Sequence, residues 1–286
     1  MIIRELRNNI SNSLCVIYDK NEAINISEWL IMEVLGVKEK IVFINMLDEE
    51  IDKNSLKYKV ILQKFKRLLR NEPIQYVLHK AWFYGFEFYV NRYTLIPRPE
   101  TEEMCLKIIQ TFIEQKNMSV LDIGTGSGCI SIILKKYFPS WSVVATDVSI
   151  NALKIAQCNA IKHNTKIKFL NDDIFRTELT KSDLKFDIIV SNPPYVPLSE
   201  KEKIKPNVKN YEPAIALFVP DENPLIFYEA ICNVANYILK NDGYIFLEVH
   251  ENYATKVEKL LTRNSYDVIL FYDMQNKQRF LMAKRI

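Results

Sequence analysis

The sequence predicts an α/β protein in which a mostly parallel sheet ends in an antiparallel edge hairpin and follows a small helical domain. Three observations favour this class. Short apolar runs alternate with segments of helical length after Thr101, residues 1–73 show helical periodicity, and an aromatic stretch joins the two parts. With 286 residues, 48% of them hydrophobic and 26% charged, the chain can bury a sizeable core.

Composition excludes several classes. No apolar run reaches the roughly 18 residues of a membrane-spanning helix, and charges at Arg4 and Glu5 interrupt the N-terminus before any signal-peptide core forms. The cysteines form no Cys-x-x-Cys pair and lie apart from the histidines, so we expect the reducing cytoplasm and no metal site. A net charge of +3 and a pI near 8.4 do not indicate a dedicated nucleic-acid domain. This charge weakens the case for a nucleic-acid partner without excluding one. We expect a monomer with no membrane and no direct nucleic-acid partner.

Residues up to about 73 are expected to form helices. One helix is predicted from about Glu22 to Leu35, where Gly36 follows as a suitable C′ residue. Another is predicted over Ser55–Arg70, because its apolar residues recur at the spacing of one buried face. The opposite face carries bases and no acid, which fits either a solvated face or a docking surface for an acidic partner. These bases are Lys57, Lys59, Lys64, Lys66, Arg67 and Arg70.

The stretch from Val77 to Leu95 is rich in aromatic and β-branched residues around Gly85, which predicts a β-hairpin between two domains. The two prolines of Ile96–Pro99 then fix an extended segment. We accordingly divide the chain into a helical domain over residues 1–75, a hairpin linker over 76–97 and an α/β domain over 98–286.

Seven strands are predicted after the linker, with helices between most of them. The link between the last two strands, Asp273–Lys277, is short and polar, so this pair is expected to form an antiparallel hairpin at one side of the sheet. The predicted strands are Met118–Ile123, Trp141–Asp147, Lys166–Asn171, Phe186–Ser191, Tyr244–Val249, Val268–Tyr272 and Arg279–Ala283. The predicted helices cover about residues 101–115, 128–138, 149–163, 225–239 and 252–263.

Glycine is rare in this chain and concentrated in one place. An average chain of this length would hold roughly 20 glycines. This one has six, of which Gly124, Gly126 and Gly128 lie within five residues. They follow an apolar strand and precede a helix, so the turn can present backbone N–H groups to a ligand at the carboxyl end of the sheet. Asp147 ends the next strand, where its carboxylate can accept hydrogen bonds from the ribose hydroxyls of an adenosine-containing cofactor.

The glycine loop favours S-adenosyl-L-methionine over a dinucleotide, because the dinucleotide fingerprint needs Gly or Ala where this chain has Cys129. Asp173, after the third strand, is placed to accept a hydrogen bond from an adenine amino group, and a solvated loop acid is equally consistent with its position. A structural turn that binds no ligand stays open as the alternative for the loop.

A second motif, Ser191-Asn192-Pro193-Pro194-Tyr195, follows the apolar strand Phe186–Val190. Its prolines remove donors and stiffen the chain, which leaves the Asn192 side-chain oxygen and the Pro193 carbonyl as two fixed acceptors. Such a pair can grip both protons of a planar NH2 group and favour the positive charge that develops there during methyl transfer. The Tyr195 ring offers a face on which a planar amide or base can stack. The alternative is a proline-rich turn without a ligand.

Together these motifs resemble amino-group methyltransferases that use S-adenosyl-L-methionine. Within that group the chain is similar to the HemK/PrmC family, which methylates the N5 nitrogen of the glutamine in the Gly-Gly-Gln motif of peptide chain release factors. The resemblance covers nearly the whole chain, although residues up to about 70 match only in being helical. It is carried by Glu72–Tyr76, Leu95–Glu102, Asp122–Gly128, Asn192–Tyr195 and Tyr211–Leu217.

The resemblance implies a seven-stranded, Rossmann-like class I methyltransferase fold, a cytoplasmic enzyme of translation termination and a helical domain that docks the substrate. It also implies roles for individual residues. Gly124, Thr125, Gly126, Ser127, Gly128, Asp147, Asp173, Ile174 and Asn192 would bind the cofactor. Asn192, Pro193, Pro194 and Tyr195 would bind the substrate glutamine, with Asn192, Pro193 and Tyr195 taking part in catalysis.

Three positions depart from the family pattern, namely Asn71 in place of glycine, Ile174 in place of an aromatic residue or Leu, and His250 in place of glycine. Two other substrates are consistent with an NH2 clamp. A nucleic-acid methyltransferase acting on an exocyclic amino group would have to flip its base and track phosphates. A related branch methylates a glutamine of a ribosomal protein, and Pro99–Glu102 favours release factors over it.

Overall fold

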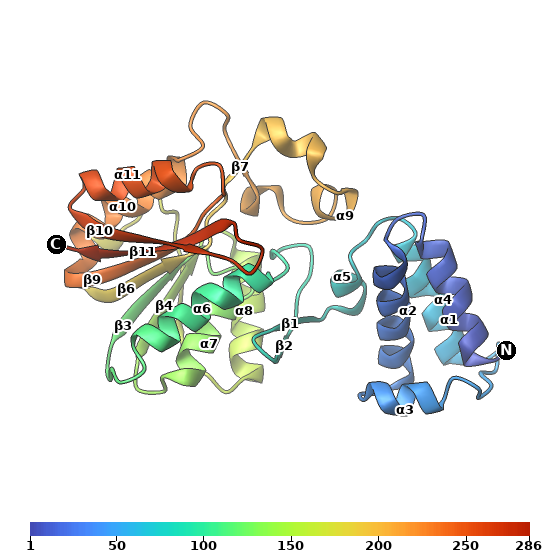
Figure 1. Ribbon diagram of the computed structural model, residues 1–286. Coiled ribbons are helices and arrows are strands. Elements are labelled where there is room, and N and C mark those ends of the chain that lie inside the picture. Colours follow the sequence, from blue (N-terminus) through green and yellow to red (C-terminus); the bar gives the residue numbers. More distant parts are fainter. The chain divides into compact units, whose positions relative to one another are not determined.

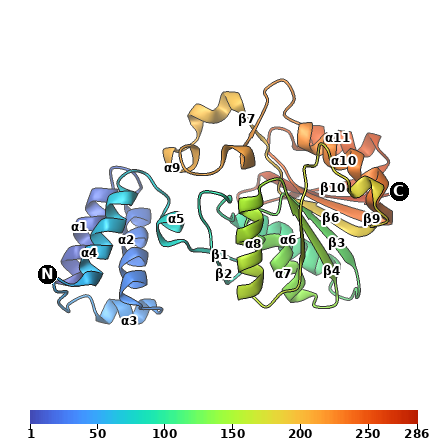
Figure 2. The same cartoon turned by 180° about the vertical axis from the view of Figure 1, so that it is seen from behind.

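The computed structural model describes all 286 residues, and the chain forms two compact units (Figures 1 and 2). The helical unit contains Met1–Lys80 together with Pro206–Tyr211. The larger unit contains Ala81–Lys205 and Glu212–Ile286. The segment around Pro206 therefore leaves the larger unit and returns to it.

The helical unit is built on helices whose ends are set by local side chains. Asp19 caps α2 by accepting hydrogen bonds from the backbone N–H groups of Asn21 and Glu22, so this helix begins before Glu22. Gly36 ends it in the left-handed conformation, with φ of 81°, as the sequence predicts. The helices are α1 (Ile3–Leu14), α2 (Lys20–Leu35), α3 (Lys40–Asn45), α4 (Leu56–Leu68), α5 (Ile74–Leu78) and α9 (Pro206–Lys209).

The basic face of α4 is partly occupied within its own unit. Lys57 and Lys64 donate to the backbone carbonyls of Leu35 and Val77, at 3.2 and 2.7 Å. The Arg67 guanidinium forms two hydrogen bonds to the Glu72 carboxylate. Half of the six bases therefore join α4 to its neighbours.

The hairpin is shorter than the aromatic stretch predicts, because Val77 and Leu78 complete α5. Its strands are β1 (Ala81–Phe83) and β2 (Phe86–Phe88). Tyr84 and Gly85 both have positive φ, of 53° and 75°, as a tight two-residue hairpin turn requires. The hairpin lies in the larger unit, where Phe83 and Phe88 are fully buried.

The larger unit contains the seven-stranded sheet that the sequence predicts, in the order β10-β11-β9-β6-β3-β4-β5. All neighbouring strands from β9 to β5 are parallel, whereas β11 is antiparallel to both β9 and β10. The predicted edge hairpin is therefore confirmed. The strands are β3 (Ser119–Ile123), β4 (Ser142–Asp147), β5 (Lys168–Asn171), β6 (Phe186–Ser191), β9 (Leu239–Glu248), β10 (Tyr266–Tyr272) and β11 (Gln278–Arg285).

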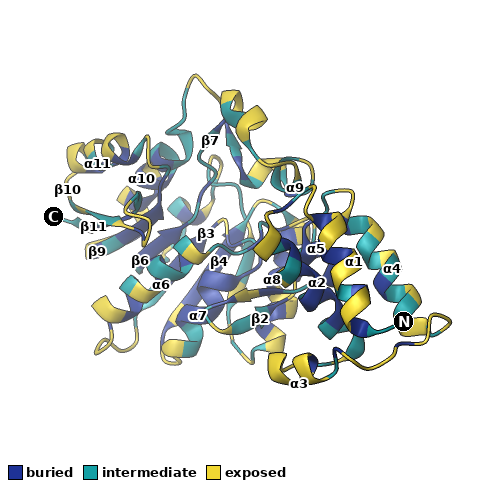
Figure 3. Cartoon of the chain, turned by 45° about the vertical axis from the view of Figure 1, so that its right-hand side comes forward, coloured by how far each residue is buried: buried dark blue, intermediate teal, exposed yellow.

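Helices cover both faces of this sheet. The helices α6 (Pro99–Thr111), α7 (Cys129–Tyr137) and α8 (Ile150–Lys162) pack on one face, and α10 (Ile226–Ile238) and α11 (Ala254–Arg263) on the other. The strands between them are largely buried (Figure 3). A parallel sheet covered in this way needs apolar strands, which explains the continuous run Ile188–Val190.

Strand register brings three loops together at the carboxyl end of the sheet. Ile123 at the end of β3 pairs with Thr146 of β4 on one side and Ser191 of β6 on the other. Ligands bind at this end of open α/β sheets. A small parallel pair that the sequence does not predict, β7 (Val196–Pro197) with β8 (Phe218–Val219), holds residues 212–217 beside the loop after β6.

Candidate active site

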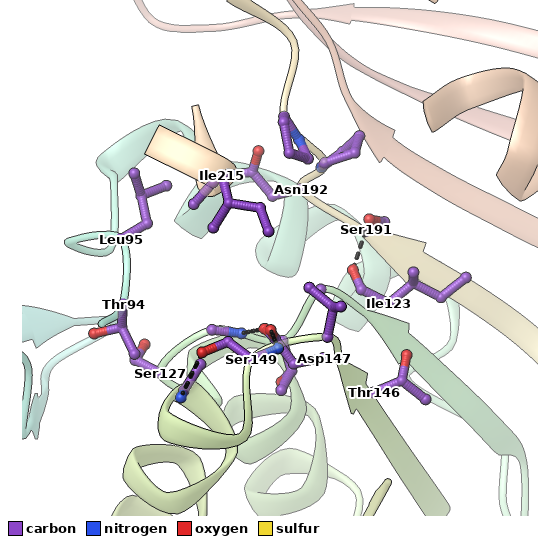
Figure 4. A pocket seen from close by; sticks show the side chains of 18 of the residues that line it. Thr94, Leu95, Ile123, Ser127, Thr146, Asp147, Ser149, Ser191, Asn192 and Ile215 are labelled. Carbon is purple, nitrogen blue, oxygen red and sulfur yellow. Dashed lines mark hydrogen bonds between the residues drawn. The ribbon is translucent and has the colours of Figure 1, made fainter. Parts of the chain in front are cut away.

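A cavity of about 350 Å³ opens where these loops meet (Figure 4). Residues following β3, β4, β5 and β6 line it, and segments 93–101 and 213–216 complete its wall. In Figure 4, Asn192 and Ile215 are at one side of the cavity, and Asp147, Ser127 and Ser149 are at the other. The motifs found separately in the sequence therefore share one space.

The glycine loop has the backbone shape that only glycine adopts without strain. Gly124, Gly126 and Gly128 have φ of 71°, 57° and 81°. A Cβ at Gly124 or Gly126 would have nothing within 4 Å, whereas one at Gly128 would touch Ala156 of α8. The first two glycines therefore leave space beside the cavity, and the third allows α7 and α8 to pack closely.

Asp147 connects the glycine loop to the start of α8. One of its carboxylate oxygens accepts from the backbone N–H of Gly126 at 2.9 Å, and the other from that of Ser149 at 2.8 Å. Burial raises the pKa of Asp147, and these two hydrogen bonds oppose the rise. Each oxygen keeps acceptor capacity for the hydroxyls of a ligand in the cavity, which Asp147 lines.

Asp122 supports the loop from below and is fully buried. Its Oδ2 accepts hydrogen bonds from the hydroxyls of Thr125 and Ser131, while its Oδ1 has no partner. Burial raises the pKa of Asp122 to about 6, against the effect of the two hydroxyls. The sequence places Asp122 in the motif but does not reveal that its carboxylate is buried and half unsatisfied.

The Asp173-Ile174 pair lies in the cavity wall together with apolar residues. Val148, Phe175 and Phe227 line the same region, and the two phenylalanine rings contact each other with centroids 5.0 Å apart. One Asp173 carboxylate oxygen accepts from the backbone N–H of Phe175 at 3.0 Å. This part of the cavity is suited to a flat, largely apolar group with a polar edge.

Asn192 enters the cavity wall directly after β6. Its Nδ2 donates to the Thr101 hydroxyl at 3.1 Å, and its Oδ1 has no hydrogen-bond partner within the chain. No backbone N–H donates to the carbonyl of Pro193, whose neighbour Pro194 also lines the cavity. Before them, the Ser191 hydroxyl donates to the Ile123 carbonyl at 2.7 Å and fixes the end of β6 to that of β3.

Tyr195 does not line the cavity with the other residues of its motif. It is partly buried against the core, and its hydroxyl donates to Glu248 at 3.0 Å. The expectation that its ring forms a stacking face for the substrate stays a prediction, and in this structure the ring is not part of the cavity wall. Burial raises the pKa of both the Tyr195 hydroxyl and the Glu248 carboxyl, because each would be charged in an apolar setting.

Glu212 joins two segments of the cavity wall that the sequence does not connect. This buried carboxylate accepts from the backbone N–H of Ile96 at 3.0 Å and from the Arg98 guanidinium at 2.5 Å. Ile96 and Arg98 belong to the proline-rich segment and Glu212 to the segment after α9. Only the folded chain shows why an acid stands between Tyr211 and Pro213.

The residues of the cavity fit S-adenosyl-L-methionine. The open space at Gly124 and Gly126 admits a ligand close to the backbone, and the Asp147 carboxylate can accept from ribose hydroxyls. The apolar wall around Ile174 suits an adenine ring. Cys129 stands where a dinucleotide loop needs Gly or Ala, which favours a nucleoside without a pyrophosphate.

Comparison with known proteins gives the family. Release factor glutamine methyltransferase of Flavobacterium psychrophilum is 39% identical over 270 residues, which cover 93% of each chain. The protein of the same name from Bacteroides thetaiotaomicron is 37% identical over 277 residues, covering 96% of this chain and 98% of that one. The chain belongs to the family of release factor glutamine methyltransferases. The family model Methyltransferase small domain also matches residues 105–208.

A solved methyltransferase from Pyrococcus furiosus has the same fold, with a TM-score of 0.52 and 19% identity over 78% of this chain and 98% of that chain. The predicted methyltransferase class, its S-adenosyl-L-methionine cofactor and the class I fold are therefore confirmed. None of the helices combines the length and apolarity needed to span a bilayer. No cluster of His, Cys, Asp or Glu side chains is arranged to hold a metal ion.

Proposed function

We propose that this protein methylates the side-chain amide nitrogen of the glutamine in the Gly-Gly-Gln motif of peptide chain release factors. The names of its relatives support release factors over a ribosomal protein or a nucleic acid. The structural observation that carries the proposal is the pair of acceptors at the cavity wall, the Oδ1 of Asn192 and the carbonyl of Pro193.

The chemistry explains why two acceptors are needed. An amide nitrogen is a weak nucleophile, because its lone pair is delocalised into the carbonyl. Two fixed oxygens that accept its protons orient the nitrogen and stabilise the positive charge that grows on it as the new bond forms. When bound, the cofactor would supply the methyl group from its sulfonium, which would be left as a neutral thioether, and the methylated amide would then lose one proton to solvent. Catalysis therefore depends on position and electrostatics, and no general base has to act before attack.

The cofactor residues are proposed from the same cavity. The glycine loop with Thr125 and Ser127 would hold the methionine portion, and Asp147 the ribose. Asp173 and Ile174 would hold the adenine, against the apolar wall. Tyr195 is proposed to act by supporting the loop through Glu248, rather than by contact with the substrate.

We further propose that the helical unit docks the release factor and that the enzyme works as a cytoplasmic monomer. All five cysteines are unpaired, which fits a reducing compartment. The exposed side chains of Lys59 and Lys66 in α4 and of Arg70 just after it make none of the contacts described above and are the remaining candidates for contact with an acidic partner. Light scattering on the purified protein tests the monomer.

Methyl transfer from labelled S-adenosyl-L-methionine to purified release factor tests the proposed function. The expected product carries one methyl group on the glutamine of Gly-Gly-Gln, located by mass spectrometry of the digested factor. A factor whose motif reads Gly-Gly-Asn is the matched control and should stay unlabelled, because its amide is one methylene too short to reach both acceptors. Labelling of ribosomal protein or nucleic acid instead of release factor would overturn the proposal.

A further inference from the structure

A buried hydrogen-bonded chain reaches Asn192 from the far side of the cavity wall. Glu248, at the end of β9, is 1% exposed and accepts from two hydroxyls. Thr101 of α6 donates to its Oε2 at 2.6 Å, and Tyr195 donates to its Oε1 at 3.0 Å. Thr101 in turn accepts from the Nδ2 of Asn192 at 3.1 Å.

With Glu248 ionised, the number of protons available fixes the direction of these hydrogen bonds. A threonine hydroxyl has one proton to donate, and here Thr101 gives it to the carboxylate. The remaining lone pairs of the hydroxyl can only accept, so the group that faces Thr101 must be the NH2 end of the Asn192 amide. The Oδ1 end of the amide is consequently turned away from Thr101 and has no partner in the chain.

We propose that Glu248 and Thr101 are positioning residues that hold the Asn192 amide in the one orientation able to accept a proton from the substrate amide. An amide side chain that is free to flip would present Nδ2 to the substrate NH2 in part of the population, and two donors facing each other cannot bond. This role deepens the proposed function and rests on it. The sequence motif alone does not assign it, because Thr101 and Glu248 lie 91 and 56 positions from Asn192 in the numbering.

Tyr195 has a secondary role in the same series of hydrogen bonds. Its hydroxyl satisfies the second oxygen of Glu248 and so keeps the carboxylate in place for Thr101. Removing that hydroxyl leaves the proton of Thr101 directed at Glu248. The effect of Tyr195→Phe on the orientation of Asn192 should therefore have the same sign as that of Thr101→Val and a smaller size.

The test is a double-mutant cycle on release-factor methylation. Thr101→Val removes the hydroxyl and keeps the shape, and we expect it to lower kcat roughly tenfold, the scale of one hydrogen bond, with little change in KM or in cofactor affinity. Thr101→Ser should restore kcat. In an Asn192→Ala background, Thr101→Val should have no further effect. Thr111→Val, on the same helix but exposed, is the matched control and should retain full activity.

Three results would overturn the proposal while the wild-type enzyme methylates the release factor. These are full activity of Thr101→Val, an equal loss in the wild-type and Asn192→Ala backgrounds, or failure of Thr101→Ser to restore the rate. If Thr101→Val does not fold, Tyr195→Phe carries the same cycle, with a few-fold loss expected in the wild-type background alone. Absence of release-factor methylation by the wild-type enzyme would instead refute the proposed function itself.

Discussion

Two loops form opposite sides of the cavity, and they are held in different ways. The glycine loop is held mainly by nearby residues: Thr125 bonds to Asp122 three positions away, and Gly126 to Asp147 twenty-one positions away. The Asn192 loop is held by distant elements: Asn192 bonds to Thr101, 91 positions away, and Tyr195 bonds to Glu248, 53 positions away. The first loop is therefore shaped largely by the β3-α7-β4 unit that contains it, and the second by elements far away in the sequence.

The buried acid behind each loop also differs, in how its two carboxylate oxygens are hydrogen-bonded. Glu248 has a hydroxyl donor for each carboxylate oxygen, whereas Asp122 has both of its donors on one oxygen and none on the other. A buried carboxylate with a donor on each oxygen holds the donating side chains in place. A buried carboxylate with one unpaired oxygen lowers the stability of the folded state. Changes near Asn192 should consequently affect the rate, and changes near Asp122 should affect stability and cofactor binding.

The largest effect is expected at the second loop. Asn192→Ala removes one of the two acceptors for the substrate amide and should lower kcat by roughly 10²–10³, the usual scale for one preorganised polar partner. Because the glycine loop keeps its own contacts, binding of S-adenosyl-L-methionine should weaken far less than turnover. Single-turnover methylation together with calorimetric titration of the cofactor separates the two. Unchanged turnover in a variant that still folds would remove Asn192 from the mechanism.

The sequence predicted most of what local patterns can encode. All seven strands, the edge hairpin and the glycine loop follow from periodicity and from the few glycines. The hydrogen bonds Thr101–Asn192, Thr101–Glu248 and Glu212–Ile96 could not be predicted, because each spans more than 90 positions of sequence. The Tyr195 ring was assigned to the substrate for a related reason, since only burial against the core shows that its hydroxyl serves Glu248.

The next prediction concerns Asp122 and the pH dependence of the free energy of unfolding. Burial raises its pKa from 3.8 to about 6 in the folded protein, so the folded state binds this proton more tightly than the unfolded state. Stability from this group is therefore fully present below pH 4 and is lost as the pH rises towards 6, by about 3 kcal/mol in all. Urea unfolding of the wild type and of Asp122→Asn across pH 4–7 should show that difference. Parallel stability curves would contradict the prediction.

A substitution at Asp147 tests whether the glycine loop and its neighbour bind the cofactor. Asp147→Asn replaces a charged acceptor and should raise the Kd of S-adenosyl-L-methionine roughly 10- to 100-fold, the scale of hydrogen bonds to a charged group. At saturating cofactor the kcat should change much less, which is the reverse of the pattern expected for Asn192→Ala. Asp221→Asn is the matched control, because Asp221 also accepts from a backbone N–H but does not line the cavity. Equal weakening by both variants would mean that the loss is structural.

The smallest effect is expected at Ser191, where the two loops share a contact. Ser191→Ala deletes the hydrogen bond to the Ile123 carbonyl and should lower the free energy of unfolding by about 1 kcal/mol. Because that bond joins the strand ends from which both loops start, kcat and cofactor affinity should fall together, each only a few-fold. Ser182→Ala removes a like bond to the Leu179 carbonyl away from the cavity and should change stability alone. A loss confined to kcat would instead mean that the position of Ser191 matters only for Asn192, and that the glycine loop is independent of its neighbour.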